Sequence, residues 1–337
     1  MKRLSVPILL FILLSILMGL SYFEVIDLYI QTIILFMGIN IITSTSLNLV
    51  NGNMGEFSCG HAGFIAVGAY VSSVLSVALF TKSRVFGAPI LPPELAAYGF
   101  PFVLICGGIA SALTGLLIAI PSFRTRDDYL AIITIAANYI IITAIINIDK
   151  IGGARGFMGM KRVIFAMEEC AEIPWMIFWV FLFTVLTVLI IRRYMTSTYG
   201  KGVEAIRQDE IAAEIMGVNT NRIKLVTFMI SSGLAGIAGG LYAHTIGYIN
   251  PKSFDLLKST EALVMVYLGG MGSITGSILS AVIFTLMLEL LRPLQIIKWV
   301  AIPLLLIIIM QFRPEGIMGH RELSDVFPRL KKFYKFK

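Results

Sequence analysis

Residues 192–224 read RRYMTSTYGKGVEAIRQDEIAAEIMGVNTNRIK, an internal stretch that is both strongly charged and rich in helix-forming residues. It carries six basic and four acidic residues, and a very apolar block lies on each side of it. Charged side chains are costly in the hydrocarbon core of a bilayer. We therefore interpret residues 192–224 as a folded loop that separates two blocks of membrane helices.

The composition supports a membrane protein. Of the 337 residues, 57% are hydrophobic and 14% are charged, whereas a soluble domain has about 25% charged residues. Several nearly charge-free runs reach the roughly 18 residues that a spanning helix needs. Because a spanning segment must satisfy its own backbone hydrogen bonds, we predict an all-α, polytopic helical bundle. About ten transmembrane helices are expected, at residues 6–22, 28–50, 61–80, 101–121, 129–147, 174–191, 225–248, 254–268, 274–291 and 296–312.

The distribution of basic residues gives the orientation. With the N-terminus inside, 17 Lys and Arg residues fall in inner segments and 10 in outer stretches, as the positive-inside rule expects. The charged loop and the basic tail, residues 313–337, both lie on the inner side of the membrane only if residues 254–291 cross the membrane twice. We therefore expect a transmembrane domain over residues 1–312 and a cytoplasmic tail, with both termini in the cytoplasm.

Several functions are disfavoured by the sequence. The net charge of +7 comes from basic residues at segment ends, which indicates a membrane surface and not a nucleic acid. The three cysteines form no C-x-x-C pair, and no metal-binding spacing or catalytic constellation is present. The sequence also lacks a G-x-x-x-x-G-K-[ST] phosphate loop, so it gives no sign of a nucleotide site in this chain.

Two glycine-rich breaks share the pattern G-x-M-G, 217 residues apart: Gly52-Asn53-Met54-Gly55 and Gly269-Gly270-Met271-Gly272. Both follow an apolar helix and are expected on the same side of the membrane. Repeated halves with interrupted helices beside the substrate path are common in transporters. The alternative is chance, because glycine is common in membrane helices. The residues that we predict to line the path are Gly52, Gly55, Ser58, His61, Gly269, Gly270, Gly272 and Ser273.

Other residues have simpler interpretations. His61 is interpreted either as a path residue or as a hydrogen-bonded interfacial histidine, and we favour the second. The glycines of residues 107–115 and 233–240 indicate close helix packing. Glu289 and Arg292, three residues apart, are expected to pair. Residues 201–216 are expected to form one short helix with apolar positions on one edge and Gly217 as its C-cap.

The segment Ile211-Ala212-Ala213-Glu214-Ile215-Met216-Gly217 resembles the E-A-A-x-x-x-G signature of permease subunits of ATP-binding-cassette importers. The wider run from Ala205 to Ala243 is similar to permeases for branched-chain amino acids. So are SLNLVNGNMGEFSCGHAGFIAVGAYV, RTRDDYLAIITIA, GGARG and LGGMGSITGSILSAV, which together extend the similarity over most of residues 46–282. There are departures, since Ile211 replaces the signature glutamate and Asn138-Tyr139 stands where relatives often have Gly-Glu.

The resemblance implies a transporter subunit of the cell membrane and not an enzyme. It implies two ATPase subunits that bind the ATP, a second permease subunit in a heterodimer and an extracytoplasmic substrate-binding protein, with no cofactor in this chain. It assigns the coupling to the ATPase to Arg207, Asp209, Glu210, Ala212, Ala213 and Gly217. The alternatives are a permease for urea, an amide or a sugar, and a secondary carrier or channel that ATP does not drive.

Overall fold

The computed structural model describes residues 5–82, 86–123, 129–170, 173–293, 300, 303–304, 307–308, 311–313, 315–319 and 321–322. Over these residues the protein is almost entirely helical, and its only strands are β1 (Phe157–Met158) and β2 (Tyr248–Ile249), which pair antiparallel. The α-helices are, in chain order, α1 (Ser5–Tyr22), α2 (Leu28–Asn48), α3 (His61–Phe80), α4 (Ala96–Ser122), α5 (Tyr129–Ile146), α6 (Met160–Cys170), α7 (Trp175–Met195), α8 (Thr198–Gln208), α9 (Glu210–Ile215), α10 (Thr220–Ile246), α11 (Leu256–Gly269) and α12 (Ile274–Leu290).

Six helical segments in the described part of the chain are long and apolar enough to cross a bilayer, and they follow the predicted spans closely. They are Leu28–Met54, His61–Phe80, Pro93–Ser122, Tyr129–Ile146, Trp175–Met195 and Thr220–Ile246. Two shorter apolar helices, Leu9–Tyr22 and Ile274–Leu290, also lie where the sequence predicts them. The predicted helix at 296–312 and the tail fall largely outside the described residues. The all-α membrane fold is confirmed.

Helix ends differ from the prediction where local polar or packing signals extend a helix. Helix α10 begins at Thr220, five residues early, because Asn219 Oδ1 accepts a hydrogen bond from the Arg222 N–H at 3.0 Å and caps it. Helix α4 begins at Ala96, and Ala96, Ala97 and Phe100 of this extra turn are buried, whereas Tyr98 is exposed. The amphipathic helix α6 was not predicted, although its buried residues recur at helical spacing.

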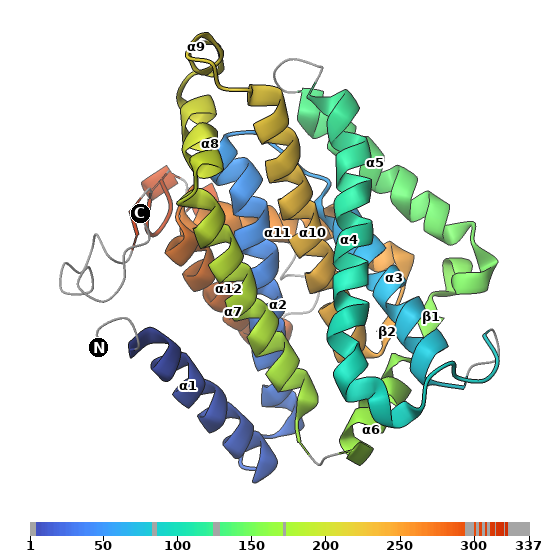
Figure 1. Cartoon of the computed structure of the whole chain (residues 1–337). Coiled ribbons are helices and arrows are strands. Elements are labelled where there is room, and N and C mark those ends of the chain that lie inside the picture. The colour runs from blue at the N-terminus through green and yellow to red at the C-terminus, as the bar shows by residue number, and fades with distance from the viewer. Residues whose placement is uncertain are drawn as a thin grey trace.

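Helices α3, α4 and α10 form the tightly packed centre of the bundle (Figure 1). A Cβ atom added to Gly236 of α10 would lie 3.0 Å from the carbonyl oxygen of Gly107 in α4, so these backbones are in direct contact. Ser111 of α4 adds a polar contact, with its hydroxyl 2.7 Å from the Ser232 carbonyl oxygen. The close packing predicted from the glycines is confirmed.

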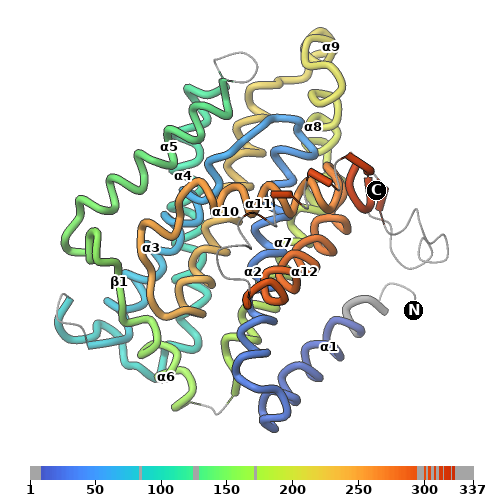
Figure 2. The backbone as a smooth tube through the Cα atoms, turned by 180° about the vertical axis from the view of Figure 1, so that it is seen from behind, coloured from blue at the N-terminus to red at the C-terminus, as the bar shows by residue number. Residues whose placement is uncertain are grey.

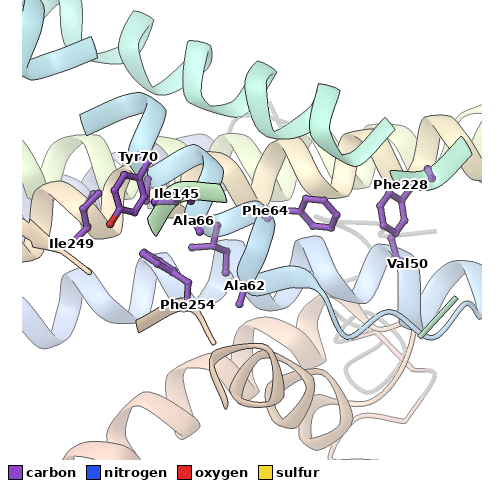
Figure 3. Packing of buried hydrophobic residues seen from close by; sticks show 14 of the residues in the cluster. Val50, Ala62, Phe64, Ala66, Tyr70, Ile145, Phe228, Ile249 and Phe254 are labelled. Atoms are coloured by element: carbon purple, nitrogen blue, oxygen red, sulfur yellow. The ribbon is translucent and has the colours of Figure 1, made fainter. Parts of the chain in front are cut away.

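Aromatic and aliphatic side chains fill the space along α3 (Figure 3). Phe64 faces Phe228 of α10 edge to face, with ring centroids 5.5 Å apart. Towards the other end of α3, Tyr70 lies beside Ile249 and Phe254, which follow α10. This apolar cluster fixes α3 and α10 relative to each other and holds the segment before α3 in place.

The charged stretch and the loop containing α6 lie at opposite ends of the molecule (Figure 1). Helices α8 and α9 project at one end, and α6 closes the other. From behind, α11 and α12 cover the bundle while α1 stands apart along one edge (Figure 2). This arrangement agrees with the charge-based orientation, which places residues 192–224 inside and residues 148–173 outside.

Candidate coupling site and translocation path

The two glycine breaks lie in direct contact. Helix α2 continues through the π-helix Leu49–Met54 into Gly55, and α11 ends at Gly269 before α12 starts. Asn48 joins them, because its Oδ1 accepts from the Gly272 N–H at 2.9 Å and its Nδ2 donates to the Ser273 carbonyl at 3.0 Å. A side chain on Gly52 would overlap the backbone nitrogen of Gly272. The predicted placement on the same side is confirmed, while the internal repeat stays a prediction.

Arg207 of α8 lies against both breaks. A Cβ atom on Gly55 would be 3.3 Å from Arg207 Cγ, and one on Gly272 would be 2.9 Å from Arg207 Nη1. Gly55 and Gly272 have φ angles of 81° and 83°, which also favours glycine there. One residue predicted to couple to a partner therefore contacts two residues predicted to line the path.

Lys224 forms a second connection at this end of the molecule. Its Nζ lies 2.6 Å from Glu56 Oε1 and 2.7 Å from Glu210 Oε2, and its side chain is 9% exposed. Glu56 directly follows the first glycine break, and Glu210 is the first residue of α9. The Phe123 ring centroid, 5.7 Å from Nζ, lies on another side of the cation.

The charged stretch forms two helices instead of the single helix predicted over residues 201–216, so that prediction is wrong. Asp209 is extended, with φ −163°, and separates α8 from α9. Its Oδ1 accepts from the Ala212 N–H at 3.0 Å, so it caps α9. Gly217, with φ +85°, ends α9 as predicted, and the Val218 N–H donates to the Ala213 carbonyl as in a Schellman motif.

Helix α9 exposes an apolar surface, which we call the α9 face and define as Ile211, Ile215 and Met216. These side chains are 72%, 80% and 83% exposed. Ala212 and Gly217 are exposed beside them, whereas Ala213 is only 5% exposed and packs inward. An apolar cluster at the tip of a charged loop is typical of a protein-binding surface. Ala213 supports this surface from below and does not form part of it.

The start of α3 is held by polar contacts from three other helices, and a fourth helix contacts one of these three. His61 Nε2 lies 2.9 Å from Ser46 Oγ of α2, so His61 is hydrogen-bonded, while its place beside the path stays a prediction. The Cys59 N–H donates to Thr134 Oγ1 of α5 and the Ala62 N–H to Ser259 Oγ of α11. The Ser231 hydroxyl of α10 donates to the Ser46 carbonyl at 2.6 Å. These contacts bring together α2, α5, α10 and α11.

Two polar groups in this region have no hydrogen-bond partner among the described residues. They are the Ser58 hydroxyl and the carboxamide of Asn138, whose residues are 1% and 0% exposed. Asn138 lies against the first turn of α3, since a Cβ atom on Gly63 would be 2.8 Å from Asn138 Oδ1. Unpaired polar groups inside a protein are costly and call for a functional explanation. The neighbouring Tyr139 is 51% exposed and lies outside this cluster.

Gly269 and Gly270 have a different environment from the other predicted path residues. The Ile317 and Met318 N–H groups donate to the carbonyls of Leu268 and Gly269 at 2.9 and 3.1 Å. Glu322, 3% exposed, accepts from the Ile274 and Thr275 N–H groups at the start of α12. The part of the tail that the structure describes therefore covers the second break.

A cavity of about 200 Å³ opens between the two breaks and α8. Asn53 and Gly272 line it from the breaks, Lys201 and Glu204 from α8, and Glu322 from the tail. At the opposite end, a larger cavity of about 660 Å³ opens beside β1 and the first turn of α6. Its charged lining residues are Lys82, Lys161 and Arg162. Cavities therefore lie towards both ends of the helical bundle.

The fold and this site define a multi-pass helical membrane protein with the organisation of a transporter subunit. The sequence matches the family model described as "Branched-chain amino acid transport system / permease component" over residues 29–311. The chain belongs to this family. No solved structure matches it.

Named relatives agree with that assignment. The chain is 32% identical over 304 residues to the high-affinity branched-chain amino acid transport system permease protein LivM of Escherichia coli K12, covering 83% of this chain and 68% of the relative. It is 25% identical over 336 residues to the probable branched-chain amino acid transport permease protein LivM of Methanocaldococcus jannaschii, covering 90% and 96%. The permease protein LivH of E. coli K12 is 27% identical over 292 residues, with 82% and 90% covered.

The sequence did not reveal several residues of this site. Asn48 falls inside a predicted apolar helix, and Lys224 is the last residue of the predicted charged loop. A lysine next to an apolar helix signals an ion pair only once its burial is known. Glu56 lies next to the first break, but nothing in its spacing indicates Lys224 as its partner. Glu322 lies in a basic tail, and no local pattern shows that its carboxylate returns to α12.

Proposed function

We propose that this chain is one of two permease subunits of an ATP-binding-cassette importer for branched-chain amino acids. Membership of the family and the printed functions of the relatives support the substrate class. The observation that carries the coupling role is the exposed α9 face at the tip of the charged loop. A soluble ATPase can cover these three apolar side chains, which the chain itself leaves in water.

The remaining partners follow from this role. Two ATPase subunits bind and hydrolyse ATP, since this sequence has no phosphate loop, and this chain itself needs no cofactor. A second, different permease subunit completes the path, and an extracytoplasmic binding protein delivers the amino acid. The assembly lies in the inner, cytoplasmic membrane of the cell.

The proposed topology has about ten crossings and both termini in the cytoplasm. The excess of basic residues in the inner segments supports it. Helix α11 has 14 residues and is about 21 Å long at 1.5 Å per residue, shorter than a bilayer core of about 30 Å. We infer that it crosses together with the preceding turn Pro251–Phe254 and the second glycine break. Short, glycine-interrupted helices of this kind line substrate paths in transporters.

In the proposed mechanism, binding of ATP by the partner displaces α9, and the helices around the glycine breaks change their packing. The path closes near Ser58, His61 and Asn138, between the two cavities. An amino acid carries an ammonium and a carboxylate group, and both need hydrogen-bond partners away from water. The unpaired Ser58 hydroxyl and Asn138 carboxamide are the groups that can supply them.

The closest alternative is a permease for urea, an amide or a sugar, which would use the same coupling site. A secondary carrier or channel would require ionisable groups in the middle of the membrane helices. The ion pairs between described residues lie near helix ends instead: Lys224 with Glu56 and Glu210, Lys258 with Glu261, and Arg292 with Glu289. The pairing predicted for Glu289 and Arg292 is confirmed.

Uptake in proteoliposomes tests the proposal. The permease pair is reconstituted with the ATPase and the binding protein, and labelled leucine, urea and a sugar are compared. We expect leucine uptake that requires ATP and the binding protein and stops with an ATPase variant that binds but does not hydrolyse ATP. Uptake of leucine that persists with this variant would overturn the importer role. Uptake of urea or the sugar alone would overturn the substrate.

A further inference from the structure

Lys224 is ion-paired both to the segment after the first glycine break and to α9. Glu56, its first partner, directly follows Gly55, the last residue of that break. Glu210, its second partner, begins the helix that carries the α9 face. Glu56 is far from Glu210 and Lys224 in the sequence, and a single ammonium group connects the three segments.

The surroundings of Lys224 make these contacts strong. Its side chain is 9% exposed and that of Glu56 is 22% exposed, so water and salt screen the pair less than a surface ion pair. Breaking a buried ion pair by removing one partner is usually strongly destabilising, because the other charge is left unpaired. Glu210 is more accessible, at 45%, and is therefore the member that can move with least cost.

A displacement of α9 therefore has a defined consequence. Because Glu210 is the first residue of α9, it moves with that helix and either pulls Lys224 with it or leaves Lys224 to Glu56 alone. Both outcomes change the force on Glu56 and on the glycine break beside it. The Arg207 side chain, which lies against Gly55 and Gly272, supports the same segment from α8.

We propose that Lys224 is a positioning residue that transmits the movement of α9 to the first glycine break through Glu210 and Glu56. This role rests on the proposed importer function. Lys224 then connects the α9 face to the translocation path, and it belongs to neither of the two. The α9 face is formed by other side chains, and Lys224 lies in the first turns of α10.

The test uses the complete complex in proteoliposomes and measures ATP hydrolysis and leucine uptake together. Lys224→Met keeps an unbranched apolar side chain and removes the charge. We expect the ATPase to co-purify and to hydrolyse ATP, while uptake per ATP falls about 2- to 30-fold, the range typical of residues that carry coupling. Lys224→Arg should retain most of the uptake per ATP. Arg222→Met, an exposed residue of the same helix turn, is the matched control and should behave as the wild type.

A double-mutant cycle with Glu210→Gln separates coupling from general damage. If both residues act through one contact, the double variant should be no worse than Lys224→Met alone. Should Lys224→Met fail to insert, the cycle is run with Glu56→Gln and Glu210→Gln. The loss of uptake per ATP in the double variant should then differ from the product of the two single losses. Independent losses would overturn the proposal.

Two further results would also overturn it. One is wild-type uptake per ATP in Lys224→Met. The other is loss of the ATPase from the purified Lys224→Met complex, because Lys224 would then belong to the docking surface. A wild-type complex that takes up no leucine with ATP would refute the importer function itself, so failure of the two proposals can be distinguished.

Discussion

At the scale of single residues, Gly52 controls how closely the two breaks approach. A Cβ atom there would overlap both the Asn48 side chain and the backbone nitrogen of Gly272. Gly52→Ala should therefore separate the breaks at a cost of about 1–3 kcal/mol, as overpacked sites usually show. We expect a lower melting temperature in detergent and loss of leucine uptake, with the protein still inserted.

Gly19→Ala in α1 is the matched control for this prediction. A Cβ atom there has no neighbour within 4 Å, so its melting temperature should not fall and its uptake should equal that of the wild type. Wild-type behaviour of Gly52→Ala in both measurements would show that the contact between the breaks does not matter for transport.

Asn138 is a second residue whose environment points to function. A buried polar group without a partner costs about 1–3 kcal/mol, and both polar atoms of its carboxamide are in this condition among the described residues. Asn138→Leu has a similar volume and removes both groups, so it should raise the melting temperature in detergent. If the carboxamide receives the substrate, leucine uptake should fall at the same time.

This combination distinguishes a functional asparagine from one that only packs. A variant that is more stable and transports normally would exclude a contact with the substrate. Asn147→Leu, at the end of α5 in an exposed position, is a control that should leave uptake unchanged.

At the scale of elements, α9 is short, and its geometry is fixed at both ends by Asp209 and Gly217. The part of α9 that is available to a partner is the exposed α9 face, whereas Ala213 is buried. Ile215→Arg places a charge in the centre of this face without disturbing the buried side of the helix. We expect loss of the ATPase during co-purification, while the permease inserts with the wild-type melting temperature.

Ile215→Met is the control, because it keeps the surface apolar and should keep the ATPase bound. Ala213→Arg is unsuitable for this purpose, since Ala213 is buried and the substitution would disturb the fold itself. Undiminished co-purification of the ATPase with Ile215→Arg would refute the docking role of the α9 face.

The helices could be predicted from the sequence because long apolar runs report directly on membrane spans. The termination of α9 at Gly217 was also predictable, because a glycine after a helical segment is a local signal. The break at Asp209 was missed because aspartate is compatible with a helix interior, and only its N-cap contact with Ala212 shows the new start.

The coupling site could be predicted only in part, since its decisive contacts join segments that are distant in sequence. Arg207 and Glu210 were identified from the charged stretch and the resemblance. Their partners Gly272 and Lys224 depend on how α8 to α10 pack against the breaks, which no local pattern contains. The inward orientation of Ala213 likewise follows from packing and not from its place in the signature.

At the scale of the whole molecule, the charge distribution and the fold together predict which end faces outward. The α6 end and the α9 end are opposite each other, so a label on one end defines the orientation of both (Figure 1). The three cysteines of the chain allow this to be measured without adding a reporter. Cys170, at the end of α6, is exposed, whereas Cys59 is buried beside the first break.

A maleimide that cannot cross the cytoplasmic membrane should therefore label Cys170 in cells whose cytoplasmic membrane is intact and whose outer layers admit the reagent. Cys59 should not react, because it is inaccessible and because burial raises the pKa of its thiol, which lowers the fraction of reactive thiolate at neutral pH. Cys170→Ser should abolish the signal, and adding Asn221→Cys to it should restore labelling only in inside-out vesicles. Labelling of Cys170 in inside-out vesicles alone would show that the proposed orientation is reversed. The α9 face would then lie outside the cell, where it could not bind a cytoplasmic ATPase.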